Sequence, residues 1–501
     1  MSVHWPIVRS LLKHPMRVLI TDDSRSYRGI DLLVGALHLA GEIGRRCSTQ
    51  TVGVMLPTGG AFPMAALATW MLGKTVVPLN YLLKQEELAY VVQDCETDTI
   101  LTAGPMLKFI GHRPEVPSVV ELDQLSFKGF PEPRWPAMAG KEDLAVILYT
   151  SGTSGRPKGV LLTHGNLRTN VRQCLEWVGI THEEVFIGVL PQFHSFGLTA
   201  LTLLPLTLGS RTIYSARFIP HRIVKLIREH RPTVLIAIPS MYNALLFVKD
   251  AAAEDFSQLQ FIVSGGEPLP QAVFDGFQKR FGKVINEGYG LTETAPVTNW
   301  CRPFEFRRGS VGHALPGIDQ RIVDVNSRAV LGPNQDGEVI MKGPNIMRGY
   351  FKLPQETGAA FDENGFFKTG DIGRLDEDGH LYITGRLKEM IIVGGENVFP
   401  REIEEALNLH PAVGASGVIG RMDPMRGELP VAFVELKEGQ KADEKALLIW
   451  CRERLAGYKV PSEIHIVPAL PRNPTGKIMR RELKHLLEQQ NNRAAEQRTR
   501  G

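Results

Sequence analysis

The chain contains little cysteine: five residues among 501, all far apart and none in a CxxC pair. This scarcity disfavours a zinc site or a disulfide framework and fits a reducing compartment. Long apolar runs are also missing, because the best candidate, Leu198–Leu208, contains Pro205 and is shorter than the ~18 residues of a membrane-spanning helix. No apolar core of a signal peptide forms near Arg9 and Lys13. We therefore expect a soluble, cytoplasmic protein with at most peripheral membrane contact.

An excess of charge of one sign is absent as well. Lysine and arginine together number 57 and the acidic residues 54, which leaves a net charge of +3. Such a small charge gives no reason to expect nucleic acid as a partner. Apolar residues make up 43% and charged residues 22%, which is typical of a globular protein.

A short apolar run, a turn of small residues and an amphipathic stretch follow one another several times along the chain. These triplets join residues 145–149 to 166–178, 233–238 to 241–248, and 261–263 to 271–281. Strands that alternate with helices indicate βαβ units and a largely parallel sheet, with ligands at the carboxyl ends of the strands. The chain is too long for one core. We predict an α/β fold whose large, multi-subdomain N-terminal domain has mostly parallel sheets flanked by helices.

The pattern changes from about Leu381. Short strand-like segments and a helix that begins at Pro400 indicate a compact α+β domain of about 110 residues. We place the boundary near Gly385–Lys388, which predicts an N-terminal domain over residues 1–386 and a small C-terminal domain over residues 387–501.

The segment YTSGTSGRPKG, Tyr149–Gly159, follows a buried strand. Its small residues allow backbone N–H groups to point inward together, its hydroxyls add donors, and Lys158 adds a positive charge. These groups suit a polyphosphate, although the spacing is not that of a Walker A loop. A flexible surface loop is the alternative.

The segment GYGLTET, Gly288–Thr294, combines glycines that permit close approach of a ligand with a hydroxyl, Thr292, and a carboxylate, Glu293. A carboxylate is a hard oxygen ligand that suits Mg²⁺ held between protein and phosphates. The alternative is a helix cap with a solvated glutamate.

Three further segments each carry one charged residue of interest. Asp371 in KTGDIG could accept hydrogen bonds from ribose hydroxyls, and Arg386 in YITGR could donate to them. Lys477 in PRNPTGK follows a glycine. Taken singly, the first two are typical of a surface ion pair and the third of a solvated lysine.

These blocks occur in the order found in the acyl-adenylate-forming superfamily, which the chain resembles over roughly residues 20–487. The resemblance also covers FHSFG (Phe193–Gly197), SGGEPL (Ser264–Leu269) and GGENVFPREIE (Gly394–Glu404). The superfamily holds acyl-CoA synthetases, adenylation domains of peptide synthetases and beetle luciferases. Among these, the chain looks most like the acyl-CoA synthetases, that is, the fatty-acid–CoA ligases.

The resemblance implies an ATP-binding site with Mg²⁺. It assigns the phosphate loop to Thr150, Ser151, Gly152, Thr153, Ser154, Gly155 and Lys158, and the adenine site to Gly266, Glu267, Pro268 and Tyr289. Asp371 and Arg386 would bind ribose, and Thr292 would contact the α-phosphate. Glu293 would bind Mg²⁺. Lys477 would bridge the substrate carboxylate and the α-phosphate, because an ammonium offsets the repulsion between two anions.

The resemblance also implies a second reaction in the same site. After adenylation the C-terminal domain rotates about a hinge near Lys388, and Lys477 leaves. A strand near GGEN then builds a tunnel for the thiol of coenzyme A. Gly394 and Gly395 would let the pantetheine arm pass close to the backbone.

The acid is indicated by the block FHSFG. Family members that activate amino acids place an aspartate there to pair with the substrate ammonium, and this chain has His194. His194 would act as a gate beside the acyl carbonyl; a packed core histidine is the alternative. Apolar residues follow in the chain and near Tyr242. We therefore predict a medium- or long-chain fatty acid.

Several alternatives remain open. The acceptor could be an acyl-carrier protein instead of CoA, the acid could be aromatic, or the fold could serve as a non-catalytic nucleotide sensor. The light-emitting reaction is disfavoured, because Ile392 stands where those members have a second lysine. Nothing in the sequence indicates the oligomeric state.

Overall fold

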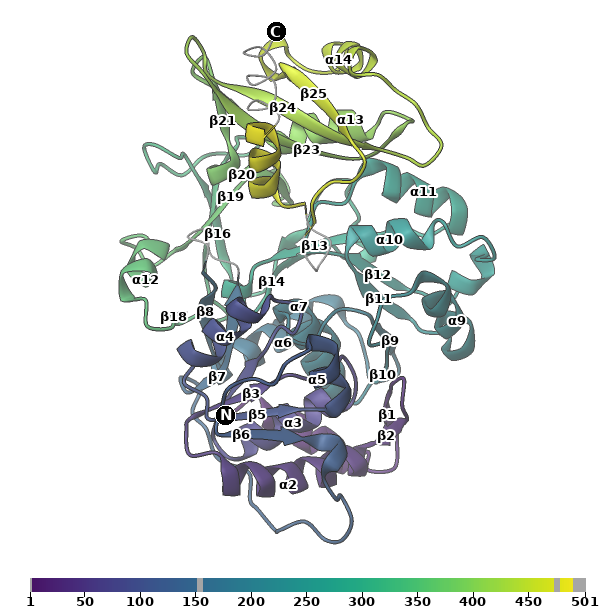
Figure 1. Cartoon of the computed structure of the whole chain (residues 1–501), viewed down its shortest axis with the longest axis vertical. Coiled ribbons are helices and arrows are strands. Elements are labelled where there is room, and N and C mark those ends of the chain that lie inside the picture. The colour runs from purple at the N-terminus through teal and green to yellow at the C-terminus, as the bar shows by residue number, and fades with distance from the viewer. Residues whose placement is uncertain (1, 151–155, 473–477, 490–501) are drawn as a thin grey trace. The chain divides into compact units, whose positions relative to one another are not determined.

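The computed structural model of the chain describes residues 2–150, 156–472 and 478–489 (Figure 1). It divides into two compact units. The first comprises Met1–Gly266, Phe277–Gln320 and Met341–Lys368, and the second comprises Glu267–Gly276, Arg321–Ile340 and Thr369–Gly501.

Two large sheets form the first unit. The seven-stranded sheet has the order β18 (Gly349–Tyr350), β8 (Lys158–Thr163), β7 (Leu144–Thr150), β4 (Thr75–Pro78), β3 (Thr51–Val54), β5 (Thr99–Thr102) and β6 (Ser118–Glu121). The nine-stranded sheet has the order β15 (His313–Ala314), β14 (Val297–Trp300), β13 (Asn286–Gly290), β12 (Phe261–Ser264), β11 (Val234–Ala237), β9 (Val185–Gly188), β10 (Arg211–Tyr214), β1 (Val18–Thr21) and β2 (Ser26–Arg28).

Helices connect these strands. They are α1 (His4–Lys13), α2 (Gly29–Arg46), α3 (Ala61–Met71), α4 (Gln85–Asp94), α5 (Gly104–Ile110), α6 (His164–Val178), α7 (Ser195–Leu198), α8 (Leu204–Leu208), α9 (Pro220–His230), α10 (Pro239–Leu245), α11 (Gln271–Phe281) and α12 (Pro354–Ala360). A π-helical segment, Thr199–Leu203, joins α7 to α8. Leu198, Leu201 and Leu204, which lie in or next to this segment, are all fully buried.

The predicted βαβ pattern is confirmed for the nine-stranded sheet. Strands β11, β12 and β13 are parallel neighbours, and α10 and α11 follow β11 and β12 as expected from the sequence. The pattern fails after β7, where the sequence indicated a helix directly after the glycine loop. An antiparallel strand, β8, comes first, and Thr150 pairs with Lys158 in the hairpin. Because β8 is short and α6 follows it directly, the sequence pattern does not separate the apolar residues of the strand from those of the helix.

The second unit contains two smaller sheets. The four-stranded sheet, to which it contributes most residues, has the order β16 (Asp319–Val323), β17 (Gly337–Lys342), β19 (Phe367–Leu375) and β20 (Leu381–Arg386). The other joins β22 (Glu396–Val398), β21 (Ile391–Val393), β24 (Gly427–Leu436) and β23 (Val413–Asp423), with β25 (Glu463–Val467) beside β24.

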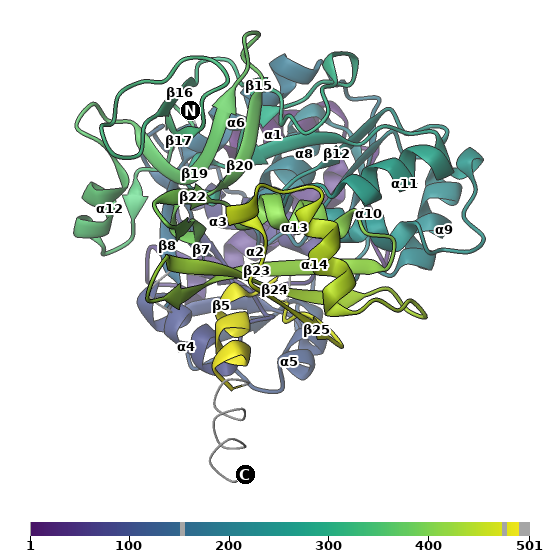
Figure 2. The same cartoon turned by 90° about the horizontal axis from the view of Figure 1, so that it is seen from above.

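Both faces of this last sheet are covered. Helices α13 (Pro400–Asn408) and α14 (Glu444–Arg452) pack on one face through Ile403 and Leu447, which meet Val418. Residues 480–489 are helical, and Leu483 packs against Phe433 on the other face (Figure 2). Successive residues of β23 and β24 therefore point in turn into two hydrophobic cores, one on each face of the sheet. The predicted α+β character of this region, and the α/β class of the chain, are confirmed.

Among the residues that the structure describes, no helix combines the length and the apolar character needed to cross a membrane.

Candidate active site

The turn that follows β13 carries two of the predicted site residues. Thr292–Thr294 form one turn of 3₁₀-helix, η4, between the antiparallel strands β13 and β14. The Thr294 hydroxyl accepts from the backbone N–H of Leu291 at 3.0 Å. Gly290 is required just before it, because a Cβ there would lie 1.8 Å from the carbonyl oxygen of Pro296. This tight turn is stabilised by its own hydrogen bond, and it fixes the backbone from which Thr292 and Glu293 project.

Glu293 accepts a hydrogen bond from a tyrosine far along the chain. The Tyr350 hydroxyl lies 3.0 Å from Glu293 Oε1. Burial and the charge of Glu293 raise the pKa of Tyr350 well above its usual value, so its hydroxyl remains a donor. This hydrogen bond holds the carboxylate in one direction. As an oriented hard oxygen ligand, Glu293 fits the predicted Mg²⁺ site.

Lys158 lies on the other side of the same tyrosine. Its ammonium is 5.6 Å from the centroid of the Tyr350 ring, within the range of a cation–π contact. Hairpin pairing with Thr150 fixes the start of β8, and β18 pairs with β8 so that Tyr350 lies opposite Val160. The β7–β8 hairpin and the η4 turn therefore meet through Tyr350.

The beginning of α7 approaches Thr292. Ser195 Oγ lies 3.1 Å from Thr292 Oγ1. His194 occupies the N-cap position, and its Nδ1 accepts from the backbone N–H of Phe196 at 3.3 Å. The His194 side chain is exposed, so the alternative of a packed core histidine is wrong. Thr292 and His194 therefore belong to one neighbourhood.

The predicted adenine segment begins where β12 ends. Gly266 has a φ of +83°, in the left-handed region that favours glycine. A Cβ on the preceding Gly265 would lie 3.0 Å from Phe196 Cζ, and one on Gly266 would lie 3.7 Å from Ile238 Cγ2. Two apolar side chains thus flank the end of β12, where Glu267 and Pro268 continue the chain. Tyr289 lies on the neighbouring strand, β13.

The second unit contains the predicted ribose residues. Asp371 on β19 lies opposite Arg386 on β20, and Arg386 Nε is 2.8 Å from Asp371 Oδ1. The Asp371 side chain is only 4% exposed and that of Arg386 is 37% exposed. The two residues are brought together as an ion pair whose guanidinium faces solvent in part.

The predicted pantetheine residues form a hairpin turn in the same unit. Gly394 and Gly395 connect β21 to β22 with φ values of +60° and +93°. Two consecutive residues with positive φ make the type of two-residue turn that suits the twist of a β-hairpin. An ideal Cβ on either glycine meets no atom of the described residues within 4 Å, which leaves room for a ligand to approach this backbone.

Some predicted residues lie outside the described part of the chain. These are Ser151, Gly152, Thr153, Ser154, Gly155 and Lys477. Lys388, the predicted hinge, is described and lies in a 3₁₀ turn, Leu387–Glu389, directly after Arg386.

Two residues of this neighbourhood were missed from the sequence. Ser195 lies within FHSFG and Tyr350 within GPNIMRGYF, so both stand in blocks that resemble the family. A serine between a histidine and a phenylalanine, or a tyrosine in a short strand, has no local feature that marks it, because the contacts join residues 97 and 57 positions apart.

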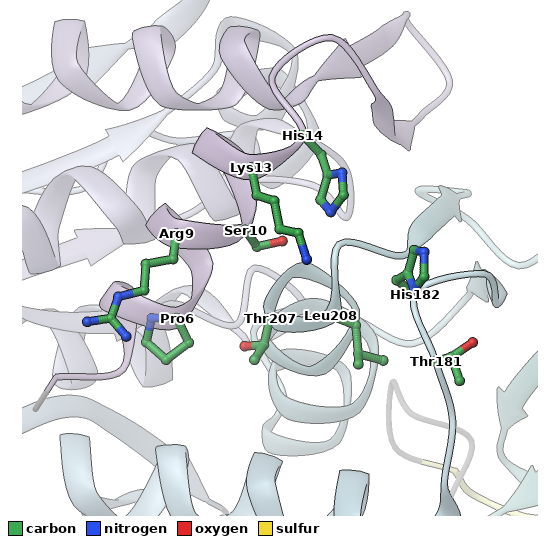
Figure 3. Close-up of a pocket in the computed structure, with 9 residues that line it drawn as sticks. All are labelled: Pro6, Arg9, Ser10, Lys13, His14, Thr181, His182, Thr207 and Leu208. Carbon is green, nitrogen blue, oxygen red and sulfur yellow. The ribbon is translucent and has the colours of Figure 1, made fainter.

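A separate pocket of about 390 Å³ lies at the carboxyl ends of α1 and α8, where Lys13, His14 and His182 point towards a common space (Figure 3). Of the predicted site residues that the structure describes, none lines it. Basic side chains are favoured at helix carboxyl ends, which accounts for Lys13 and His14 there.

Comparison with known proteins identifies the family of this chain. A family model described as AMP-binding enzyme matches residues 14–351, and one described as AMP-binding enzyme C-terminal domain matches residues 402–477. The chain belongs to the AMP-binding enzyme family. The resemblance to the acyl-adenylate-forming superfamily is thereby confirmed.

Two curated relatives illustrate the range of the family. A long-chain-fatty-acid–CoA ligase of Bacillus subtilis is 40% identical over 70% of this chain, a match that spans 62% of that relative. A 2-succinylbenzoate–CoA ligase of Bacillus velezensis is 33% identical over 96% of this chain and 98% of the relative.

Solved structures agree over nearly the whole chain. ATP-bound MatB from Rhodopseudomonas palustris has a TM-score of 0.88 and 30% identity, covering 97% of this chain and 99% of that one. O-succinylbenzoate CoA synthetase from Bacillus subtilis, in complex with ATP and a magnesium ion, has a TM-score of 0.84 and 29% identity, covering 96% and 99%.

Proposed function

We propose that this enzyme activates a medium- or long-chain fatty acid as an acyl-adenylate and transfers the acyl group to CoA. The general activity, whatever the acid, is that of an AMP-forming acid–CoA ligase, which uses ATP, Mg²⁺ and CoA. The observation that carries the proposal is one continuous series of contacts in the first unit. It links Lys158, Tyr350, Glu293, Thr292 and Ser195.

This series matches the charge that adenylation develops. The carboxylate oxygen of the acid attacks the α-phosphorus of ATP, and the bond from that phosphorus to pyrophosphate breaks. Lys158 would hold the leaving phosphates, and Thr292 would donate its hydroxyl to the α-phosphate. A magnesium ion held by Glu293 would offset the negative charge on the phosphates. Lys477 would approach the attacking carboxylate as a second cation.

The second step needs a different set of residues. The sulfur of CoA attacks the acyl carbonyl carbon, the bond from that carbon to the AMP oxygen breaks, and the thiol proton leaves to solvent. The open turn at Gly394 and Gly395 would let the pantetheine arm approach along the backbone. We place the domain boundary of residues 1–386 and 387–501 at the hinge residue Lys388, so that this turn can replace Lys477.

The preference for an apolar acid is supported by the side chains beside the end of β12. Phe196 and Ile238 border Gly265 and Gly266, and both are only partly buried. Phe193 packs edge-on against Tyr81, with ring centroids 4.9 Å apart. His194 provides no carboxylate for a substrate ammonium, which disfavours amino acids. The leucines that follow His194, among them Leu198 and Leu201, are fully buried.

An aromatic acid is the second candidate. The relative that acts on 2-succinylbenzoate matches this chain from end to end, whereas the match to the fatty-acid ligase spans 62% of that relative. Both acids would meet the same apolar border, so only kinetics separates them.

The test is a pyrophosphate-exchange assay over saturated fatty acids of increasing length, 2-succinylbenzoate, ferulate and amino acids. We expect exchange to be fastest with a fatty acid, and a second assay to yield acyl-CoA with CoA but no product with acyl-carrier protein. Faster exchange with an aromatic acid would replace the fatty-acid assignment. Absence of exchange with every acid would leave a nucleotide-binding protein without ligase activity.

A further inference from the structure

The segment that precedes and includes β18 makes three hydrogen bonds to the turn of Thr292 and Glu293. Asn345 Nδ2 donates to the carbonyl of Thr294 at 2.8 Å, and the backbone N–H of Met347 donates to the carbonyl of Glu293 at 2.7 Å. The third bond comes from Tyr350 to Glu293 Oε1 at 3.0 Å. We call residues 345–350 the brace, because they contact the turn from one side along its length.

The brace is itself held firmly. Asn166, in the first turn of α6, donates from Nδ2 to the carbonyls of Pro344 and Ile346 at 2.9 and 2.8 Å. Arg348 N donates to the carbonyl of Leu161 at 3.0 Å, and β18 pairs with β8. Asn345 is fully buried. Because side-chain and sheet hydrogen bonds both anchor it, the brace presents Tyr350 from a rigid base.

The hydrogen bond of Tyr350 differs from the other two bonds of the brace in its acceptor group. Asn345 and Met347 donate to backbone carbonyls of the turn, whereas Tyr350 donates to the carboxylate of Glu293. A neutral phenol restricts the rotation of a glutamate side chain without cancelling its charge, whereas a lysine or arginine would compete with a metal ion.

We propose that Tyr350 is the positioning residue for the metal-binding carboxylate of Glu293. Its hydroxyl fixes the direction in which Glu293 presents oxygen to Mg²⁺ on bound ATP. The same ring lies under Lys158, so one side chain aligns the residues that serve the metal and the leaving phosphates. The inference deepens the proposed function and rests on the role of Glu293 given there.

The test is the substitution Tyr350→Phe, which keeps the ring beside Lys158 and removes only the hydroxyl. Mn²⁺ replaces Mg²⁺ as the probe, and its affinity for the enzyme with ATP is measured by electron paramagnetic resonance. We expect the affinity to fall about 10–100-fold, the usual effect of losing an outer partner of a metal ligand. The KM for the metal–ATP complex should rise, and excess Mg²⁺ should restore most of the rate.

Tyr214→Phe is the matched control. Tyr350 is partly buried and Tyr214 fully buried, and the hydroxyl of Tyr214 donates to the backbone carbonyl of Leu201. We expect this variant to lower the melting temperature and to leave Mn²⁺ affinity unchanged. If Tyr350→Phe behaves like it, with lower stability and unaltered Mn²⁺ affinity, Tyr350 is merely structural and the inference is overturned.

Glu293→Gln separates this inference from the proposed function. If it weakens Mn²⁺ binding and the double variant Tyr350→Phe/Glu293→Gln is no weaker, the two residues act as one unit, as proposed. Additive losses would overturn the positioning role and leave the ligand role of Glu293 intact. Unchanged Mn²⁺ affinity in Glu293→Gln would overturn both.

Discussion

At the scale of single residues, hydrogen bonds restrict the directions in which the side chains of the candidate site point. The side chain of Thr292 contacts that of Ser195, and the side chain of Glu293 accepts a hydrogen bond from Tyr350. Gly290 acts by what it lacks, since any side chain there would meet the carbonyl of Pro296. If these residues serve as proposed, the contacts pre-organise the site and lower the cost of orienting its groups when substrates bind.

Two buried histidines make stability depend on pH. His4 and His164 lie next to each other, with ring centroids 6.1 Å apart, and burial lowers the pKa of each to about 4. In the unfolded chain both have pKa values of about 6.5. Between these values the unfolded state binds more protons than the folded state. Stability is therefore fully present above pH 6.5 and falls as pH drops towards 4.

We expect His164→Gln to reduce this loss. Each histidine contributes a slope of up to about 1.4 kcal/mol per pH unit. Urea unfolding at pH 7.5 and pH 5.5 measures the difference, and the wild type should lose more stability than the variant. His221→Gln, which changes an exposed histidine, is the control and should behave like the wild type. Equal loss in all three proteins would show that other groups cause the acid sensitivity.

At the scale of elements, an arginine holds the C-terminal helix to the sheet of the second unit. Arg480 lies at the start of helical residues 480–489 and pairs with Glu404 on α13 at 2.8 Å and with Glu389 at 2.9 Å. The Glu404 side chain is only 14% exposed, and it also accepts from the backbone N–H of Val418. Burial raises the pKa of Glu404, which Arg480 opposes. Through these two ion pairs, Arg480 connects the C-terminal helix to α13 and to Glu389, which is adjacent to the predicted hinge residue Lys388.

Removing one partner should be costly. We expect Arg480→Met to destabilise the second unit by about 3 kcal/mol, because Glu404 is left unpaired in a mostly buried position. Hydrogen exchange at Val418 reports the loss locally. The double variant Arg480→Met/Glu404→Leu should recover most of the stability, since an apolar pair carries no unpaired charge. No recovery would mean that the bonds of Arg480 to Glu389 and the backbone matter more than its pair with Glu404.

At the scale of the whole molecule, the proposed reaction uses one set of residues in two arrangements. The hinge proposal assigns adenylation to Lys477 and thioester formation to the turn of Gly394 and Gly395. Lys388 lies in a short 3₁₀ turn between β20 and β21, a place where a few residues can absorb a large φ and ψ change.

Lys388→Pro should separate the two half-reactions. Proline fixes φ and so restricts the rotation, and we expect thioester formation from supplied acyl-AMP to fall about tenfold or more while pyrophosphate exchange changes little. Lys477→Ala should show the reverse, with exchange lost and thioester formation spared. Lys388→Ala, which leaves φ free, is the control. If both half-reactions survive Lys388→Pro, the hinge lies elsewhere.

The sequence was informative where the pattern is local. Period and length predicted α10, α11 and α13 within a few residues, and the collinear blocks predicted the family. The strand β8 was missed, because six residues between a glycine loop and a helix have too short a period to recognise. The leucines after His194 illustrate a second limit, since apolar periodicity is the same for a core helix and a pocket wall.

What the sequence determined by itself is the chemistry available: hydroxyls, a carboxylate, a lysine and glycine turns in the order of one enzyme family. What only the tertiary structure decided is which of these groups touch. Tyr350 reaches Glu293 because β18 pairs with β8 in one register, and Ser195 reaches Thr292 because α7 begins beside the end of β13. Such contacts depend on how segments that are distant in the sequence pack together, and the local sequence around each residue does not determine that packing.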